Sequence, residues 1–111
     1  MPTAQFVHNG NAIDHTPTTN VSAGDVIVLG DLVCIAKLDI PANTLGALAV
    51  VGVFDIAKAT GASTAIAAWA TCYWNATTKQ VTTVATGNKL MGTCIQAASD
   101  TAETVRIRLN Q

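Results

Sequence analysis

Turn-forming residues recur about every ten positions along this chain, and short runs rich in β-branched and apolar residues lie between them. This spacing is typical of all-β domains. It predicts a small single-domain β-barrel or β-sandwich that is built from hairpins, with at most one short helical turn. A chain of 111 residues has room for one domain, which we expect to span residues 1–111, with residues 1–6 as an N-terminal arm.

Three pairs of strands are predicted from the turns that would join them. Asn9-Gly10 suits a type I′ hairpin, because both residues tolerate a positive φ. Gly30-Asp31 separates two uninterrupted apolar runs, VIVL and LVCIA, which suggests strands that are covered on both faces. The predicted hairpins join residues 5–7 to 12–14, residues 25–29 to 32–36, and residues 71–74 to 80–84.

The remaining segments include the longest apolar run, at residues 47–56, which has Gly52 in its middle. A helix would fit this run, but its valines and its internal glycine favour one buried strand that bends or bulges. Residues 61–70 are predicted to form a wide loop or one helical turn. Residues 89–97 and 104–109 are the last predicted strands, and the final one alternates Val105, Ile107 and Leu109 inward with polar residues outward.

The chain carries few charges for its size. Charged residues make up 12% of it, against about 25% in an ordinary soluble domain, although 50% of its residues are apolar. None of the apolar runs is long enough to cross a membrane. We therefore expect part of its exterior to be buried against other chains. The net charge of −1 and the scattered cations argue against direct binding to nucleic acid.

The three cysteines, Cys34, Cys72 and Cys94, each lie in an apolar, strand-like segment. Their odd number and their surroundings favour three reduced core thiols over a disulfide, which would fit a reducing compartment. The first ten residues have neither a basic region nor an apolar stretch of the kind found in signal peptides, so we expect no export.

The sequence offers no set of residues that suggests catalysis. Asp14, His15 and Ser22 could be imagined as a triad, but no nucleophile-elbow pattern surrounds Ser22. No Cys or His spacing suits zinc, and no phosphate-binding loop is present. We therefore predict that the chain is not an enzyme and needs no metal and no cofactor.

An aromatic group lies near the middle of the chain, at Trp69, Tyr73 and Trp74. These side chains could stack on a sugar, but without flanking cations they are better explained by core packing or by a subunit contact.

Several turn-and-strand segments follow one another in a specific order along the chain. They are FVHNGNAIDHT (6–16), SAGDVIVLG (22–30), LGALAVVGVFDIAKA (45–59), YWNA (73–76), VTTVAT (81–86), GNKLMG (87–92) and VRIRLN (105–110). In order and spacing they resemble a known family of small proteins from tailed phages and prophages, DUF2190, whose members resemble capsid decoration or cement proteins. The resemblance covers nearly the whole chain.

The resemblance implies a β domain on the outside of an icosahedral shell, where it bridges and stabilises major capsid protein subunits. The chain would be made in the host cytoplasm and located in the virion. We expect a homotrimer, and the alternatives are another virion part, such as a tail or fibre-base module, or a carbohydrate-binding module. The short, uncharged N-terminal arm is predicted to help attach the protein by adding to an exposed strand edge. Its candidate partner-binding residues are Pro2, Thr3, Ala4, Gln5 and Phe6.

Overall fold

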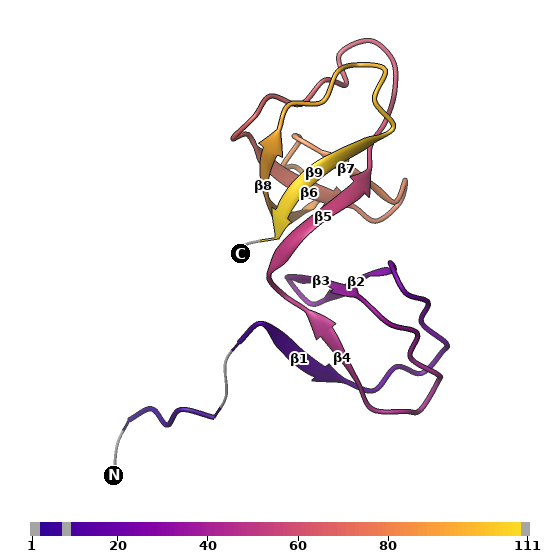
Figure 1. The fold of residues 1–111 in the computed structure, drawn as a ribbon, viewed down its shortest axis with the longest axis vertical. Coiled ribbons are helices and arrows are strands. Elements are labelled where there is room, and N and C mark those ends of the chain that lie inside the picture. Colours follow the sequence, from indigo (N-terminus) through magenta and orange to yellow (C-terminus); the bar gives the residue numbers. More distant parts are fainter. Residues whose placement is uncertain (1–2, 8–9, 110–111) are drawn as a thin grey trace.

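The computed structural model describes residues 3–7 and 10–109, and this part of the chain folds into nine strands without a helix (Figure 1). The prediction of an all-β fold is therefore confirmed. The strands are β1 (Ala12–His15), β2 (Val26–Leu29), β3 (Leu32–Ala36), β4 (Gly46–Ala49), β5 (Gly52–Ala57), β6 (Thr71–Asn75), β7 (Gln80–Thr82), β8 (Lys89–Gln96) and β9 (Thr104–Leu109).

The strands form two antiparallel sheets. The first is a four-stranded sheet with the order β1-β4-β3-β2, and the second has five strands in the order β5-β9-β8-β6-β7. The two end strands of the second sheet, β5 and β7, come together at a parallel bridge between Lys58 and Val81. This bridge partly closes the five-stranded sheet, which we call the barrel.

The main core fills the barrel and continues onto the four-stranded sheet. Met91, Cys94 and Ile107 of the barrel are fully buried, and Val33 and Ile35 of β3 belong to the same cluster. Because residues alternate between the faces of a strand, the other side chains of β3 point the opposite way. They join a second, smaller cluster, which consists of Val21, Cys34, Ala36, Ile40 and Leu48. Strand β3 is thus buried on both faces, as its LVCIA run predicts. The same prediction for the VIVL run is wrong, because β2 is an end strand and its residues are only half-buried.

Several predicted elements are confirmed. The hairpin around Gly30-Asp31 forms as β2 and β3, and the hairpin at residues 71–82 forms as β6 and β7. In β9, Val105, Ile107 and Leu109 are buried while the residues between them are exposed. Residues 61–70 form a loop that is tied to the rest of the barrel by a bridge between Ile66 and Ala98.

The predicted first hairpin is wrong in its pairing. Residues 12–15 do form a strand, but β1 pairs with β4, where Ile13 lies opposite the buried Leu48. Residues 5–7 form no strand, and Asn9 lies outside the described residues. Pairing with β4 lets Ile13 pack against the second cluster. The free energy gained by burying this side chain outweighs the preference of Asn9-Gly10 for a local turn.

The prediction of a single strand at residues 47–56 is also wrong. The run forms two strands in two different sheets, β4 and β5, and the chain changes sheet between them (Figure 1). Gly52 has a φ of 134°, which a residue with a side chain rarely adopts, so the glycine allows the change of direction. The residues on β5 are mostly exposed on its outer face rather than buried.

Candidate functional site

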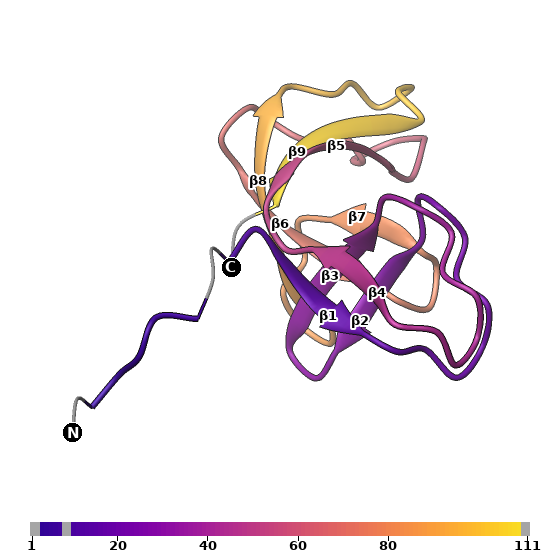
Figure 2. The same cartoon turned by 60° about the horizontal axis from the view of Figure 1, so that its bottom comes forward.

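The N-terminal arm is the first predicted binding segment. Thr3, Ala4, Gln5 and Phe6 are all exposed, and the Phe6 side chain is 80% exposed. Pro2 lies outside the described residues. The segment precedes β1 in the chain and points away from both sheets (Figures 1 and 2). It is therefore an exposed, uncharged stretch of chain with one large apolar side chain, that of Phe6.

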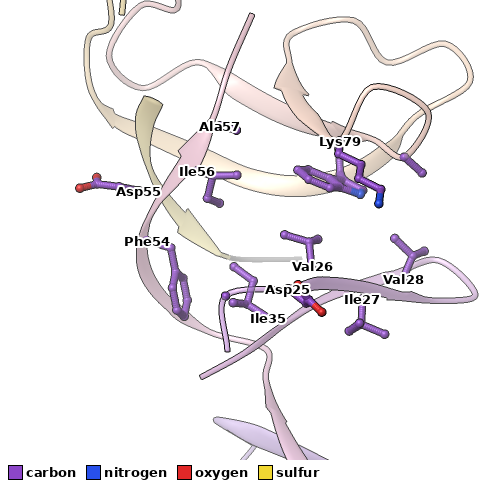
Figure 3. A pocket seen from close by; sticks show the side chains of 13 residues that line it. Asp25, Val26, Ile27, Val28, Ile35, Phe54, Asp55, Ile56, Ala57 and Lys79 are labelled. Carbon is purple, nitrogen blue, oxygen red and sulfur yellow. The ribbon is translucent and has the colours of Figure 1, made fainter. Parts of the chain in front are cut away.

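A groove of about 620 Å³ lies between β2 and the barrel (Figure 3). The side chains of Val26 and Val28 point across the groove toward the barrel, whereas Ile27 points to the other side of β2. Six large apolar residues line the groove and make its floor hydrophobic: Val26, Val28, Ile35, Phe54, Ile56 and Trp74. Its walls thus come from both sheets, which sequence reasoning did not foresee.

Three charged residues also border the groove. Asp55 points away from it (Figure 3) and is held on the outer face of the barrel by Arg106, whose Nε donates to Oδ1 at 2.9 Å. Hydrogen bonding from Arg106 lowers the pKa of the Asp55 carboxyl. Asp25 and Lys79 are exposed and complete the border. The floor of the groove is therefore uncharged.

The edges of the two sheets differ in composition. The end strands are β1 and β2 in the four-stranded sheet and β5 and β7 in the barrel. Three of these strands carry charged or polar residues, whereas β2 consists of four apolar residues that are all half-buried. An uncharged edge strand readily pairs with another strand, which makes β2 a candidate binding edge.

The cysteines are buried and free, as the sequence predicts. Burial raises the pKa of the Cys72 thiol to about 11 and also raises the pKa of Cys34. The Cys94 thiol donates to the carbonyl of Gln96 at 3.1 Å. These thiols are therefore packing groups, and burial keeps Cys34 and Cys72 in the neutral, unreactive form at neutral pH.

A buried lysine is the polar feature that sequence reasoning missed. Lys58 is 3% exposed, and its Nζ donates to the carbonyls of Ala59 at 2.7 Å and Ala102 at 3.2 Å. It also lies 3.4 Å from the hydroxyl of Thr64. Asp100 holds the same loop through the backbone N–H groups of residues 64 and 65. These bonds tie the β5–β6 and β8–β9 loops together at one end of the barrel.

The residues considered for catalysis are not assembled into a site. Asp14 and His15 are neighbours in β1, so their side chains point to opposite faces, and Ser22 lies in the loop before β2. The Ser22 N–H donates to Asp25, which is an ordinary turn contact. Within the described ranges, no three His, Cys, Asp or Glu residues lie close enough together to hold a metal ion. The same ranges contain no helix that could span a membrane.

The aromatic group is divided between the core and the surface. Trp74 is 7% exposed and packs in the main core, and Trp69 is 72% exposed in the loop before β6. Tyr73 precedes Trp74 in β6 and so faces the other side of the strand. The three rings therefore do not share one face, as a sugar-stacking platform would require.

Comparison with known proteins decides the family. The chain matches the phage cement protein family over residues 7–109, which is most of its length. It belongs to that family. The match agrees with the resemblance to capsid decoration proteins, and membership implies a structural role and a place in the phage capsid. No curated protein and no solved structure matches the chain.

Proposed function

We propose that this phage cement protein binds the outer surface of the assembled major capsid protein shell and stabilises it. The family match over residues 7–109 is the observation that carries the proposal. A protein that binds the assembled shell and not its separated subunits stabilises the shell by its binding free energy. Each copy needs only a modest contact, because the symmetry of the shell repeats it many times. The role is structural, without catalysis.

The surface of the molecule supports this proposal. Large apolar side chains are exposed in several places, among them Phe6, Val7, Leu38, Leu45 and Trp69. An exterior with few charges and many apolar residues is suited to contact with other chains. Binding to the shell should therefore depend only weakly on salt, because few charges are available for screening.

We further propose that the protein acts as a homotrimer. A threefold ring contacts several capsid subunits at once, so that its release requires several contacts to break together. Sedimentation of the purified chain, and of the chain released from particles, measures the mass of the assembly. A protein that is strictly monomeric both in solution and on the shell would contradict this part of the proposal.

The N-terminal arm is assigned to attachment. Residues 2–6 carry no charged side chain, so their backbone can add to a strand edge without desolvating a charge. Deleting residues 2–5 should lower the occupancy of undecorated capsids while leaving the folded domain intact. Unchanged occupancy would show that the arm has no part in attachment.

The main experiment compares bare and decorated capsids. Purified chain is added to capsids that lack it, bound copies are counted by imaging, and the melting temperature of the particles is measured. We expect binding to saturate at a fixed number of copies per shell. Decorated particles should also have a higher melting temperature than bare ones. Copies located on the tail would favour the other virion role, and equal melting would disprove stabilisation.

A further inference from the structure

We propose that the groove between β2 and the barrel binds the N-terminal arm of a second copy of this chain, which adds to β2 as an extended strand. The inference rests on the proposed function in one respect, namely that copies lie close together on a shell. The arm then contributes to attachment by joining neighbouring copies on the shell, and β2 of the next copy is the strand edge that receives it.

The edge strands differ in composition, and β2 is the one without charged or polar residues. Natural proteins protect free strand edges with charges or prolines, or they cover them with another segment. In the described part of the chain, β1 has Asp14 and His15, β5 has Asp55 and β7 has two polar residues. Strand β2 has only Val, Ile and Leu, and half of the backbone groups of an antiparallel edge strand face away from its partner. An added strand would cover them.

The groove and the arm also fit each other in their side chains. Val26 and Val28 point into the groove, where Phe54 and Trp74 supply aromatic surface (Figure 3). In an extended segment alternate residues share a face, so Phe6 enters the groove together with Ala4. Burial of an exposed phenylalanine against other rings is favourable beyond the area that it covers.

The arm itself is suited to such a contact. Residues 3–7 (TAQFV) have neither charge nor proline, and Phe6 is 80% exposed. Ordering such a segment costs conformational entropy, which burial of the Phe6 side chain offsets. The uncharged arm thus matches the apolar floor of the groove.

The geometry favours a neighbouring copy as the donor. The arm leaves from β1, and the groove lies along β2, which is the opposite edge of the same four-stranded sheet. The arm points away from both sheets (Figures 1 and 2). Its five described residues span roughly 16 Å when extended, enough to cover the four residues of β2. Donor and acceptor surfaces on opposite edges generate a head-to-tail ring, which is compatible with a trimer.

Disulfide trapping between two variants, each with one added cysteine, tests the inference. The donor is Ala4→Cys, which keeps Phe6 in place, and the acceptors are Val26→Cys and Val28→Cys, which sample two registers. The three natural cysteines are buried and free, so mild oxidation should leave them unreacted. Because donor and acceptor lie on different chains, a disulfide between them can only form between copies.

The control acceptor is Leu38→Cys, at an exposed position that does not line the groove. We mix donor and acceptor in purified form at high concentration and also on decorated particles. The groove acceptors should yield on the order of tenfold more linked pairs than the control, because docking raises the effective concentration. Equal yields in both settings would overturn the inference.

A second variant tests the same contact without cysteines. Val28→Lys places a charge on the β2 edge and should weaken self-association about as much as deletion of residues 2–7, whereas Leu38→Lys should not. Unchanged self-association in both groove and arm variants would contradict the inference.

Other results separate this inference from the proposed function. Linkage of the arm cysteine to the capsid protein, with no linkage between copies, would refute arm exchange and leave the cement role intact. A disulfide found only within single chains of an Ala4→Cys/Val28→Cys double variant would refute it as well. Failure of the chain to bind capsids at all would count against the function instead.

Discussion

The barrel and the four-stranded sheet differ at their end strands. In the barrel, β5 and β7 meet at the Lys58–Val81 bridge, and a buried lysine ties the adjoining loops. In the four-stranded sheet, β1 and β2 have no strand beyond them in the described chain, and β2 is only half-buried. The barrel thus partly closes on itself, whereas the four-stranded sheet leaves its edges open.

The residues that stabilise the fold and those available for binding therefore lie in different regions. The fully buried side chains lie mostly in the barrel and on the face of β3 that packs against it. The arm, the groove and the uncharged edge all belong to the four-stranded sheet or border it. We therefore expect substitutions in the barrel to change folding, and substitutions along β2 and the arm to change assembly.

The largest effect should come from truncation in the barrel core. Ile107 is fully buried in β9, and Ile107→Ala should lower the free energy of unfolding by about 2–5 kcal/mol, because it leaves a cavity. Ile27→Ala in the half-buried β2 is the matched change and should cost less. Denaturant unfolding of both variants measures the difference. Equal losses in the free energy of unfolding would contradict the assignment of most of the stability to the barrel.

The next effect concerns the buried lysine of the barrel. Lys58→Met keeps most of the volume but leaves the carbonyls of residues 59 and 102 without their donor. Burial of unsatisfied carbonyls should cost about 1–3 kcal/mol. Lys37→Met, at an exposed position, is the control and should be nearly neutral. A neutral Lys58→Met would show that the loops hold together without this side chain.

A smaller effect should appear at alkaline pH. Burial raises the pKa of Cys72 in the folded state to about 11 from an ordinary value of 9.0, so folding favours the protonated thiol. Stability from this group is complete below pH 9 and is lost as the pH rises toward 11. Between pH 8 and pH 10 the free energy of unfolding should fall by about 1 kcal/mol more than in Cys72→Ala. Parallel pH profiles of the two proteins would disprove this linkage.

The sequence predicts the local part of the fold well. The Gly30-Asp31 and residue 75–79 turns join strands that are neighbours in the chain, and both hairpins form. The alternation of β9 depends only on the period of a strand, and it is correct. Such features follow from short-range patterns, which a single sequence displays directly.

The nonlocal part of the fold could not be predicted in the same way. Strand β1 pairs with β4, more than thirty residues further along, and no local signal at Asn9-Gly10 indicates that partner. The groove arises because Val26 and Phe54 belong to different sheets, which only tertiary packing brings together. Lysine is usually exposed, so nothing in the sequence suggests that Lys58 is buried.

The smallest effect should come from the ion pair that connects the two regions. The Lys89 Nζ of β8 donates to Oδ1 of Asp31 in the β2–β3 turn at 2.6 Å, and this hydrogen bond lowers the pKa of the carboxyl. The contribution of a carboxyl with a depressed pKa is present above its ordinary value of 3.8 and is lost as the pH falls through the folded value. The Asp31 side chain is 94% exposed and that of Lys89 is 45% exposed, so solvent and salt screen the pair. Asp31→Asn should leave the unfolding midpoint at neutral pH almost unchanged, and Lys89→Met should behave alike. A large, salt-sensitive loss in either variant would mean that this exposed contact, rather than the shared core at β3, holds the sheet against the barrel.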